Sequence, residues 1–269
     1  PDELQEMLRL REVALADTGE VSLTIKSETL SDHYTHRATP YVPLAGRLVR
    51  VYSYTRAAAG IDPASVREIT DSLCRVEEAS PAQVRVVVTC SDATRGRCAC
   101  VMATFTHFTP DVFAPHLMSF QGEILASYAA LPLAGCCKDE WGFPPDYTGC
   151  PEKNDYWFSR AMAAEYARAA NGRDLATDML LMWSPHLGRE AERIAAINRY
   201  QELCWRRNAT LEADFHRAVK ATFGPDAFVG THATWWPHPD RREFKKNGLD
   251  WWAATRDWAQ TDETTPFSV

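Results

Sequence analysis

The chain has 269 residues, of which 45% are apolar and 24% are charged. This balance is typical of a soluble globular chain with one large or two small domains, and it excludes disordered and collagen-like proteins. No run reaches the roughly 18 consecutive apolar residues of a membrane-spanning helix. The net charge of −7 disfavours a nucleic-acid partner, because such proteins gather basic surface against phosphates.

The N-terminal sequence and the cysteine content indicate what to expect of the protein's location and of its disulfide bonds. The chain begins without a methionine and without the apolar core of a signal peptide, so we expect an excerpt of a longer protein whose location, secreted or periplasmic included, stays open. Eight cysteines are too few for a disulfide scaffold, and most are expected to be reduced core thiols. No cysteine pair has zinc-knuckle spacing, so no metal and no other cofactor is predicted.

The first part of the chain is rich in predicted strands. Four runs contain many Val, Thr, Tyr or Phe residues between turn residues, over positions 20–27, 46–54, 83–90 and 98–107. The turn-forming stretch 91–97 predicts a hairpin between the last two runs. All nine tryptophans lie after residue 140, so residues 1–108 are assigned to a separate β-rich region.

From residue 109 onward, helical segments alternate with apolar strand-like segments. Thr109 and Pro110 can begin a helix that ends near Leu131. The apolar run 132–137 lacks period-two alternation, which is typical of a strand covered on both faces in a parallel sheet. Two more helices and a second apolar strand are predicted over residues 158–172, 189–222 and 227–232.

This alternation favours an α/β fold, because parallel strands need crossover connections. A doubly wound sheet and a (β/α)8 TIM-type barrel both satisfy it, and in both the functional groups gather beyond the carboxyl ends of the strands. We predict the barrel, with residues 109–269 as its central portion and residues 1–108 as a β-rich N-terminal region or insertion with early barrel elements. A full barrel takes about 250 residues. This one is therefore expected to be incomplete, with the remainder missing from the chain.

Two acidic pairs are the candidates for catalysis. Asp139 and Glu140 follow the first apolar strand and precede Trp141, and aromatic surroundings raise a carboxyl pKa toward the range of a general acid. Asp262 and Glu263 follow a tryptophan-rich segment. Glycosidic cleavage needs two carboxyl groups, roughly 5 Å apart for retention and roughly 6.5 to 9.5 Å apart for inversion. The alternative for either pair is a cap, a salt bridge or a stabilised loop.

Further candidates follow the second apolar strand. A histidine at a strand end can hydrogen-bond a sugar hydroxyl, relay a proton or bind a metal, and tryptophan rings stack on sugars. A metal hydrolase would combine two histidines with Asp139 or Asp240, but no HExxH motif or closely spaced histidine pair is present. Substrate binding is therefore assigned to Asp139, Trp141, His232, Trp235, Trp236 and His238.

Other segments carry weaker signals. The motifs of serine hydrolases, P-loop proteins and dinucleotide-binding proteins are absent. Arg206 and Arg207 are expected on the solvated face of the long helix. The glycosylation motif that begins at Asn208 falls in the same helix and is expected to be accidental.

The order of these segments resembles that of (β/α)-barrel glycoside hydrolases, most closely the large bacterial enzymes grouped with the family 106 α-L-rhamnosidases. The similarity covers residues 45–235: a β-rich segment, then PDVFAPHLMSFQGEILASYAALPLAG leading into KDEWGFPP, then a helical passage ending in FVGTH. In that family, a helix introduced by an Asp-Val or Asp-Leu phrase precedes a strand ending in Asp-Glu. A later strand ends in Thr/Gly-His.

The resemblance implies that Glu140 ends the fourth barrel strand as the acid or acid/base, that His232 ends the fifth, and that Glu263 lies beyond the sixth. If the family's second carboxylate lies outside this chain, Glu263 has no catalytic role and the fragment alone is inactive. We predict a glycoside hydrolase that cleaves O-glycosidic bonds of glycans, with Glu140 as proton donor and Asp262 or Glu263 as second carboxylate. A noncatalytic carbohydrate-binding or scaffold module and a metal-dependent hydrolase are the alternatives.

Overall fold

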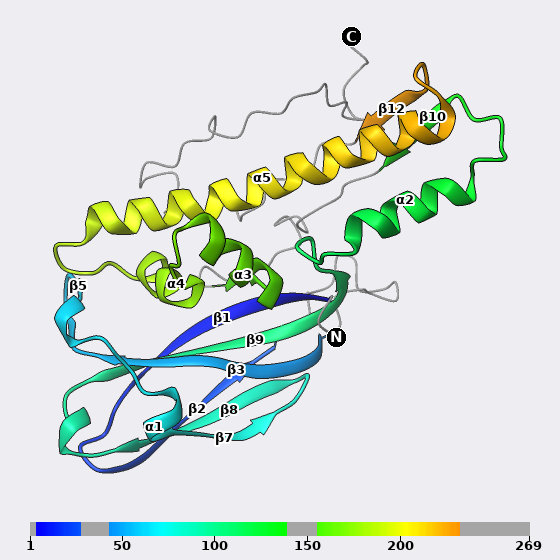
Figure 1. The fold of residues 1–269 in the computed structure, drawn as a ribbon. Helices are drawn as coiled ribbons and strands as arrows, with labels where there is room; N and C mark the ends of the chain where they lie inside the picture. Colours follow the sequence, from blue (N-terminus) through cyan, green and yellow to red (C-terminus); the bar gives the residue numbers. More distant parts are fainter. Residues whose placement is uncertain (1–3, 28–42, 139–154, 232–269) are drawn as a thin grey trace.

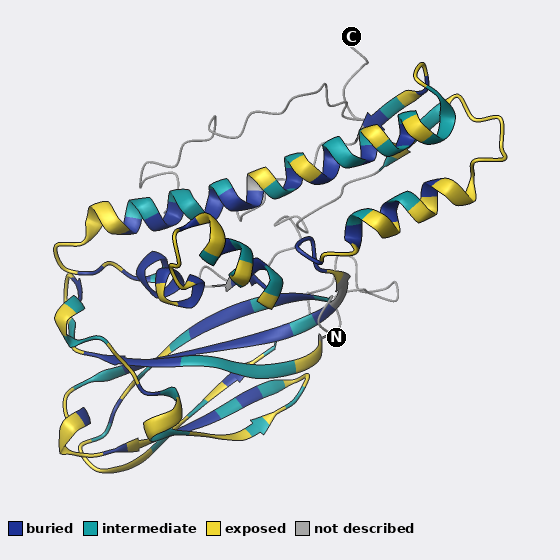
Figure 2. Cartoon of the chain, viewed as in Figure 1, coloured by how far each residue is buried: buried dark blue, intermediate teal, exposed yellow. Residues whose placement is uncertain are grey.

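The computed structural model describes residues 4–27, 43–138 and 155–231. Two antiparallel sheets stack face to face, and helices cover the outer face of the larger sheet (Figure 1). Buried side chains form one cluster between the sheets and a second cluster between the larger sheet and the helices. The ribbon of the larger sheet and of the helices above it is accordingly coloured as buried over much of its length (Figure 2). Within the described ranges, no helix combines the length and apolarity needed to cross a membrane.

The larger sheet has five antiparallel strands in the order β11-β1-β9-β3-β6. Their bounds are β1 (Leu4–Ala14), β3 (Pro43–Tyr54), β6 (Arg67–Glu68), β9 (Cys98–Pro110) and β11 (Asp155–Phe158). The smaller sheet has the order β2-β8-β7, with bounds β2 (Gly19–Lys26), β7 (Cys74–Ala79) and β8 (Gln83–Cys90). Shorter elements are β4 (Arg56–Ala57), β5 (Gly60–Ile61), η1 (Pro63–Ser65), α1 (Thr70–Leu73) and η2 (Asp92–Thr94).

All four runs predicted as strands are confirmed, as β2, β3, β8 and β9. The hairpin predicted over residues 91–97 is wrong, because β8 pairs with β2 and β7 whereas β9 pairs with β1 and β3. This segment instead carries the chain from one sheet to the other. Alternate residues of β9 then enter different layers: Val101 packs between the sheets, while Cys100 and Met102 pack toward the helices.

The helices are α2 (Leu117–Ser127), α3 (Arg160–Ala169), α4 (Leu175–Trp183) and α5 (Glu190–Phe223). Ser159 caps α3 by accepting a hydrogen bond from the Met162 amide, at 2.9 Å. The helix predicted to end at residue 172 ends as α3 at Ala169, and Asn171 and Gly172 follow with left-handed φ of 55° and 83°. The predicted start of α2 is wrong: residues 109 and 110 belong to β9, and the helix begins later.

Two short strands form a parallel pair beside the C-terminal end of α5 (Figure 1). They are β10 (Gly135–Lys138) and β12 (Phe228–Thr231), which confirms both predicted apolar strands and their parallel direction. The expected burial of β10 on both faces is wrong, since its residues are half-buried or exposed. A small core anchors the pair to α2 and α5 through Leu125, Phe215, Val219 and Ala227.

The predicted (β/α)8 barrel is wrong for the residues that the structure describes. Their two main sheets are open and antiparallel, and neither a closed barrel nor a repeated parallel β/α alternation is present among them. The apolar runs that favoured the barrel became β10 and β12, which form only a two-stranded parallel pair beside α5. The strand that is buried on both faces is β9 of the antiparallel sheet, because the second sheet covers one of its faces and helices cover the other.

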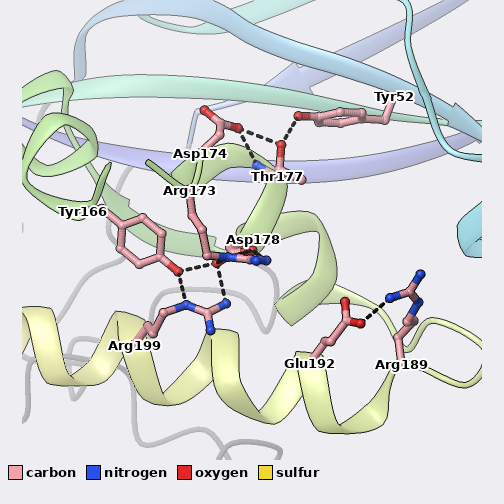
Figure 3. A network of polar contacts seen from close by, with 9 residues as sticks. All are labelled: Tyr52, Tyr166, Arg173, Asp174, Thr177, Asp178, Arg189, Glu192 and Arg199. Atoms are coloured by element: carbon pink, nitrogen blue, oxygen red, sulfur yellow. Dashed lines mark hydrogen bonds and ion pairs between the residues drawn. The ribbon is translucent and has the colours of Figure 1, made fainter. Parts of the chain in front are cut away.

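A buried carboxylate holds the three helices above the larger sheet together (Figure 3). Asp178 on α4 is 1% exposed and accepts hydrogen bonds from Tyr166 of α3 at 2.5 Å and from Arg199 of α5 at 2.7 Å. Arg173, between α3 and α4, adds bonds at 2.5 and 2.9 Å. Burial alone would raise the pKa of Asp178, but these hydrogen bonds outweigh burial and hold that pKa below its usual value.

The same helices are joined to the sheet by a second polar contact. Asp174 caps α4 by accepting from the backbone amide and the hydroxyl of Thr177, at 2.8 Å each. The Thr177 hydroxyl in turn lies 2.9 Å from the hydroxyl of Tyr52 on β3. The N-terminus of α4 is therefore fixed over the sheet (Figure 3).

A close approach between β3 and the β7–β8 loop predicts the effect of one small substitution. A Cβ atom on Gly46 would lie 2.4 Å from the backbone oxygen of Ser80, so Gly46→Ala is expected to destabilise the fold by about 2 kcal/mol. Gly122→Ala is the matched control, because Gly122 lies in α2 with open space around it and alanine favours helix. Urea denaturation that finds Gly46→Ala as stable as wild type would contradict this packing.

The Asp178 cluster gives a second prediction. Asp178→Asn removes the buried negative charge that two guanidinium groups share and turns one of its acceptor oxygens into an NH2 donor, and we expect a loss of about 3 kcal/mol, the low end for a broken buried pair because both arginines are partly exposed. Glu192→Gln is the control, since Glu192 and Arg189 form an exposed pair worth about 0.5 kcal/mol or less. Equal losses in the two variants, measured by thermal and urea unfolding, would refute a central role for Asp178.

Candidate functional site

The nine residues predicted to act in the site all lie outside the described residues: Asp139, Glu140, Trp141, His232, Trp235, Trp236, His238, Asp262 and Glu263. The strands that precede two of these segments are described. Lys138 ends β10 and Thr231 ends β12, and the two are Cα partners in the parallel ladder. The chain therefore leaves both strands at the same end of the pair, directly before the sequence positions of Asp139 and His232. We call this carboxyl end of the two strands the β10–β12 edge.

Lys138 places a shielded amine at this edge. Its Nζ atom is buried and lies 5.1 Å from the centre of the Phe215 ring on α5. Burial lowers the pKa of Lys138 to about 8, and the nearby carboxylates of Glu212 and Asp214 oppose that shift. The lysine is therefore much closer to losing its charge near neutral pH than an exposed lysine.

A polar stripe on α5 extends from this edge along the helix, and we define it as Gln201, Asn208 and Glu212. These side chains are seven and four residues apart, which places them on one side of the helix. Their exposed fractions are only 2%, 4% and 1%. Gln201 Nε2 and Asn208 Oδ1 make no hydrogen bond within the described part of the chain. An unsatisfied buried polar group costs about 1–3 kcal/mol, so such groups mark places where a polar ligand or ordered water can bind.

Helix α2 packs against α5 next to the stripe. Gln121, which is 8% exposed, donates from Nε2 to the Leu211 backbone oxygen and to Asp214 Oδ2, each at 3.4 Å. These contacts hold α2 against the part of α5 that carries Glu212. Lys138, Gln121, Glu212 and Asp214 thus form one polar cluster where β10, α2 and α5 meet, and Asn208 and Gln201 continue the stripe from it along α5.

The sequence did not reveal this stripe, because helical spacing shows which residues share a face and not what covers that face. Leu211, Phe215 and Val219 recur at spacings of four along the helix, and all three are buried. The signal for the stripe lay beside them, as amide and carboxylate side chains at the same helical spacing next to an apolar face. Asn208 was noticed only as part of an accidental glycosylation motif.

In ranges 4–27, 43–138 and 155–231, no group of three or more His, Cys, Asp or Glu residues gathers to hold a metal ion. The seven cysteines in those ranges are free thiols, but only Cys90, Cys100 and Cys204 are buried, so the expectation that most cysteines are core thiols is wrong for these ranges. The histidines considered for a metal hydrolase lie outside those ranges.

Comparison with known proteins gave no match: neither a family model, nor a curated protein, nor a solved structure resembles this chain closely enough to be matched.

The shielded lysine predicts a pH dependence of stability. The Lys138 pKa is about 8 in the folded chain against an ordinary value of 10.5, so the unfolded chain binds more protons between these pH values. Stability therefore rises with pH across this window. We expect the difference in unfolding free energy, wild type minus Lys138→Met, to increase by at most about 3 kcal/mol from pH 8 to 10.5.

The control for this prediction is Lys138→Arg. A guanidinium stays charged throughout the window, so this variant should lack the gain in stability. Urea denaturation at several pH values measures all three proteins. A difference between wild type and Lys138→Met that does not change with pH would show that Lys138 is not buried as a low-pKa amine.

Proposed function

We propose that the protein is a carbohydrate-active hydrolase that cleaves an O-glycosidic bond at the edge where β10 and β12 end. The observation that supports this most directly is the parallel register of the two strands, with Lys138 opposite Thr231. The two segments that carry most of the predicted site residues begin at this one edge. Residues at the carboxyl ends of adjacent parallel strands are well placed to act on the same ligand.

The proposed catalytic roles follow from carboxylate chemistry. Glu140, two residues after Lys138, donates a proton to the leaving oxygen, and Asp262 or Glu263 supplies the second carboxylate. Asp139, Trp141, His232, Trp235, Trp236 and His238 contact the sugar. These assignments rest on the sequence, because all of these residues lie outside the described ranges.

The polar stripe on α5 supports a polyhydroxylated ligand. Sugars present many hydroxyl groups that both donate and accept hydrogen bonds, and side-chain amides match both roles. Gln201 and Asn208 each keep an amide atom without a hydrogen bond among the described residues, and Glu212 adds a buried carboxylate. An apolar ligand would leave these atoms unsatisfied, so the chemistry of the cluster favours a sugar over a lipid-like molecule.

Activity on a panel of aryl glycosides tests the proposal, with the full-length protein as the enzyme. Glu140→Gln is expected to lower kcat by about a hundredfold or more, because it removes the general acid. Glu190→Gln is the matched control, since Glu190 is an exposed carboxylate at the opposite end of α5 and should have no effect. Rates of Glu140→Gln within a few-fold of wild type would refute the assigned role.

The same panel separates the alternatives. Saccharide binding without turnover, and unchanged by replacement of Glu140, Asp262 and Glu263, would replace the hydrolase with a noncatalytic binding module. Turnover that is lost with a chelator and restored by zinc or manganese would support the metal-dependent hydrolase instead. Absence of both turnover and saccharide binding would reject a carbohydrate function.

A further inference from the structure

A groove of about 430 Å³ lies between α3 and α5, on a different side of α5 from the polar stripe. Its α5 wall carries Arg199, Glu202 and Arg206, which are three and four residues apart and so share one helical face. Its α3 wall carries Glu165 and Tyr166. The groove is within the size range of small-molecule sites, roughly 300 to 1,000 Å³.

One guanidinium of the groove is held in a fixed orientation. Arg199 donates to Asp178 Oδ2 at 2.7 Å and from Nε to the Tyr166 hydroxyl at 3.2 Å (Figure 3). Its side chain is still 28% exposed. Arg199 is therefore positioned before any ligand arrives, which lowers the entropic cost of binding.

Arg207 closes the floor of the groove instead of facing solvent, which corrects the expectation for this residue. It donates to the backbone oxygens of Val112 and Ala114, at 2.5 and 3.3 Å, and lies 5.8 Å from the centre of the Phe113 ring. Burial lowers its pKa, while the negative charge of Asp111 opposes that shift. The Arg207 guanidinium is thus bound to residues 112–114.

Arg206 is the guanidinium at the mouth of the groove. Its side chain is 76% exposed, as the sequence predicted, and it pairs with Glu202, four residues before it. On the opposite wall, Glu165 pairs with Arg168, outside the groove. Three arginines and two glutamates line the groove, so its lining is net positive in a chain of net charge −7.

We propose that this groove binds a small molecule through an anionic group, a carboxylate or a phosphate. Arg199 and Arg206 hold the anion, because planar guanidinium groups match the geometry of both. The body of the ligand rests on the apolar lining of Phe113, Ala170 and Leu203. The site is separate from the edge of β10 and β12, and it does not depend on the proposed hydrolase activity.

Calorimetric titration of the full chain with glucuronate, inorganic phosphate and glucose tests the proposal. We expect at least one of the two anions to bind, and glucose, which has a similar size but no charge, to bind at least tenfold more weakly than glucuronate. Phosphate binding without glucuronate binding identifies a phosphate ligand, and the reverse identifies a carboxylate. A Kd weaker than about 10 mM for both anions, or equal affinity for glucose, overturns the proposal.

Variants on α5 locate the site. Arg206→Ala is expected to weaken anion binding about tenfold or more, through loss of a charge-assisted hydrogen bond. Arg217→Ala is the matched control, since Arg217 is also exposed and paired with an acid on α5 but lies outside the groove. Glu202→Gln should tighten binding, because it frees Arg206. Binding that is unchanged in Arg206→Ala, or equally weakened in Arg217→Ala, places the anion elsewhere and overturns the assignment.

Discussion

The buried carboxylate of Asp178 is the interaction on which the helical layer depends. A charge removed from water is stable only when it is paired and fully hydrogen-bonded. Here the partners come from three places in the chain, Tyr166 of α3, Arg173 of the α3–α4 connection and Arg199 of α5. The carboxylate therefore fixes how these segments sit relative to one another. Its low pKa also means that its contribution to stability is present above about pH 4 and is lost as the pH falls through that pKa.

Helix α5 links this cluster to both candidate binding regions. Its 34 residues span about 50 Å, long enough to run from the helices over the larger sheet to the parallel pair β10–β12. One face carries Arg199 and Arg206 toward the groove, and another carries the polar stripe toward Lys138. Because both surfaces belong to one rigid element, fixing α5 through Asp178 orients both. A substitution of Asp178 is therefore expected to disturb the orientation of both surfaces.

Much of the local structure could be predicted from the sequence, whereas strand pairing could not. Strands such as β8 and β9 were located from their composition, and the end of α3 from Asn171 and Gly172. The hairpin between β8 and β9 failed because a turn-rich segment can equally join two sheets. Helix α4 was missed because its apolar residues surround the helix and leave no periodic signal, as in other buried helices. The polar stripe was missed because helical spacing shows which residues share a face and not what covers that face.

The sequence by itself determined the approximate positions of the strands β2, β3, β8 and β9 and of the helices α3 and α5, that β10 and β12 are apolar strands, and which acidic and aromatic residues are candidates for carbohydrate chemistry. These properties depend on residues close together in the chain, through caps, turns and periodicity. Only the tertiary structure decided that the β-rich part forms two antiparallel sheets, that no barrel closes in the described ranges, and that Lys138 meets Glu212 and Phe215. Those outcomes depend on contacts between distant segments, whose partners are selected by burial and charge pairing in three dimensions and leave no mark in local sequence.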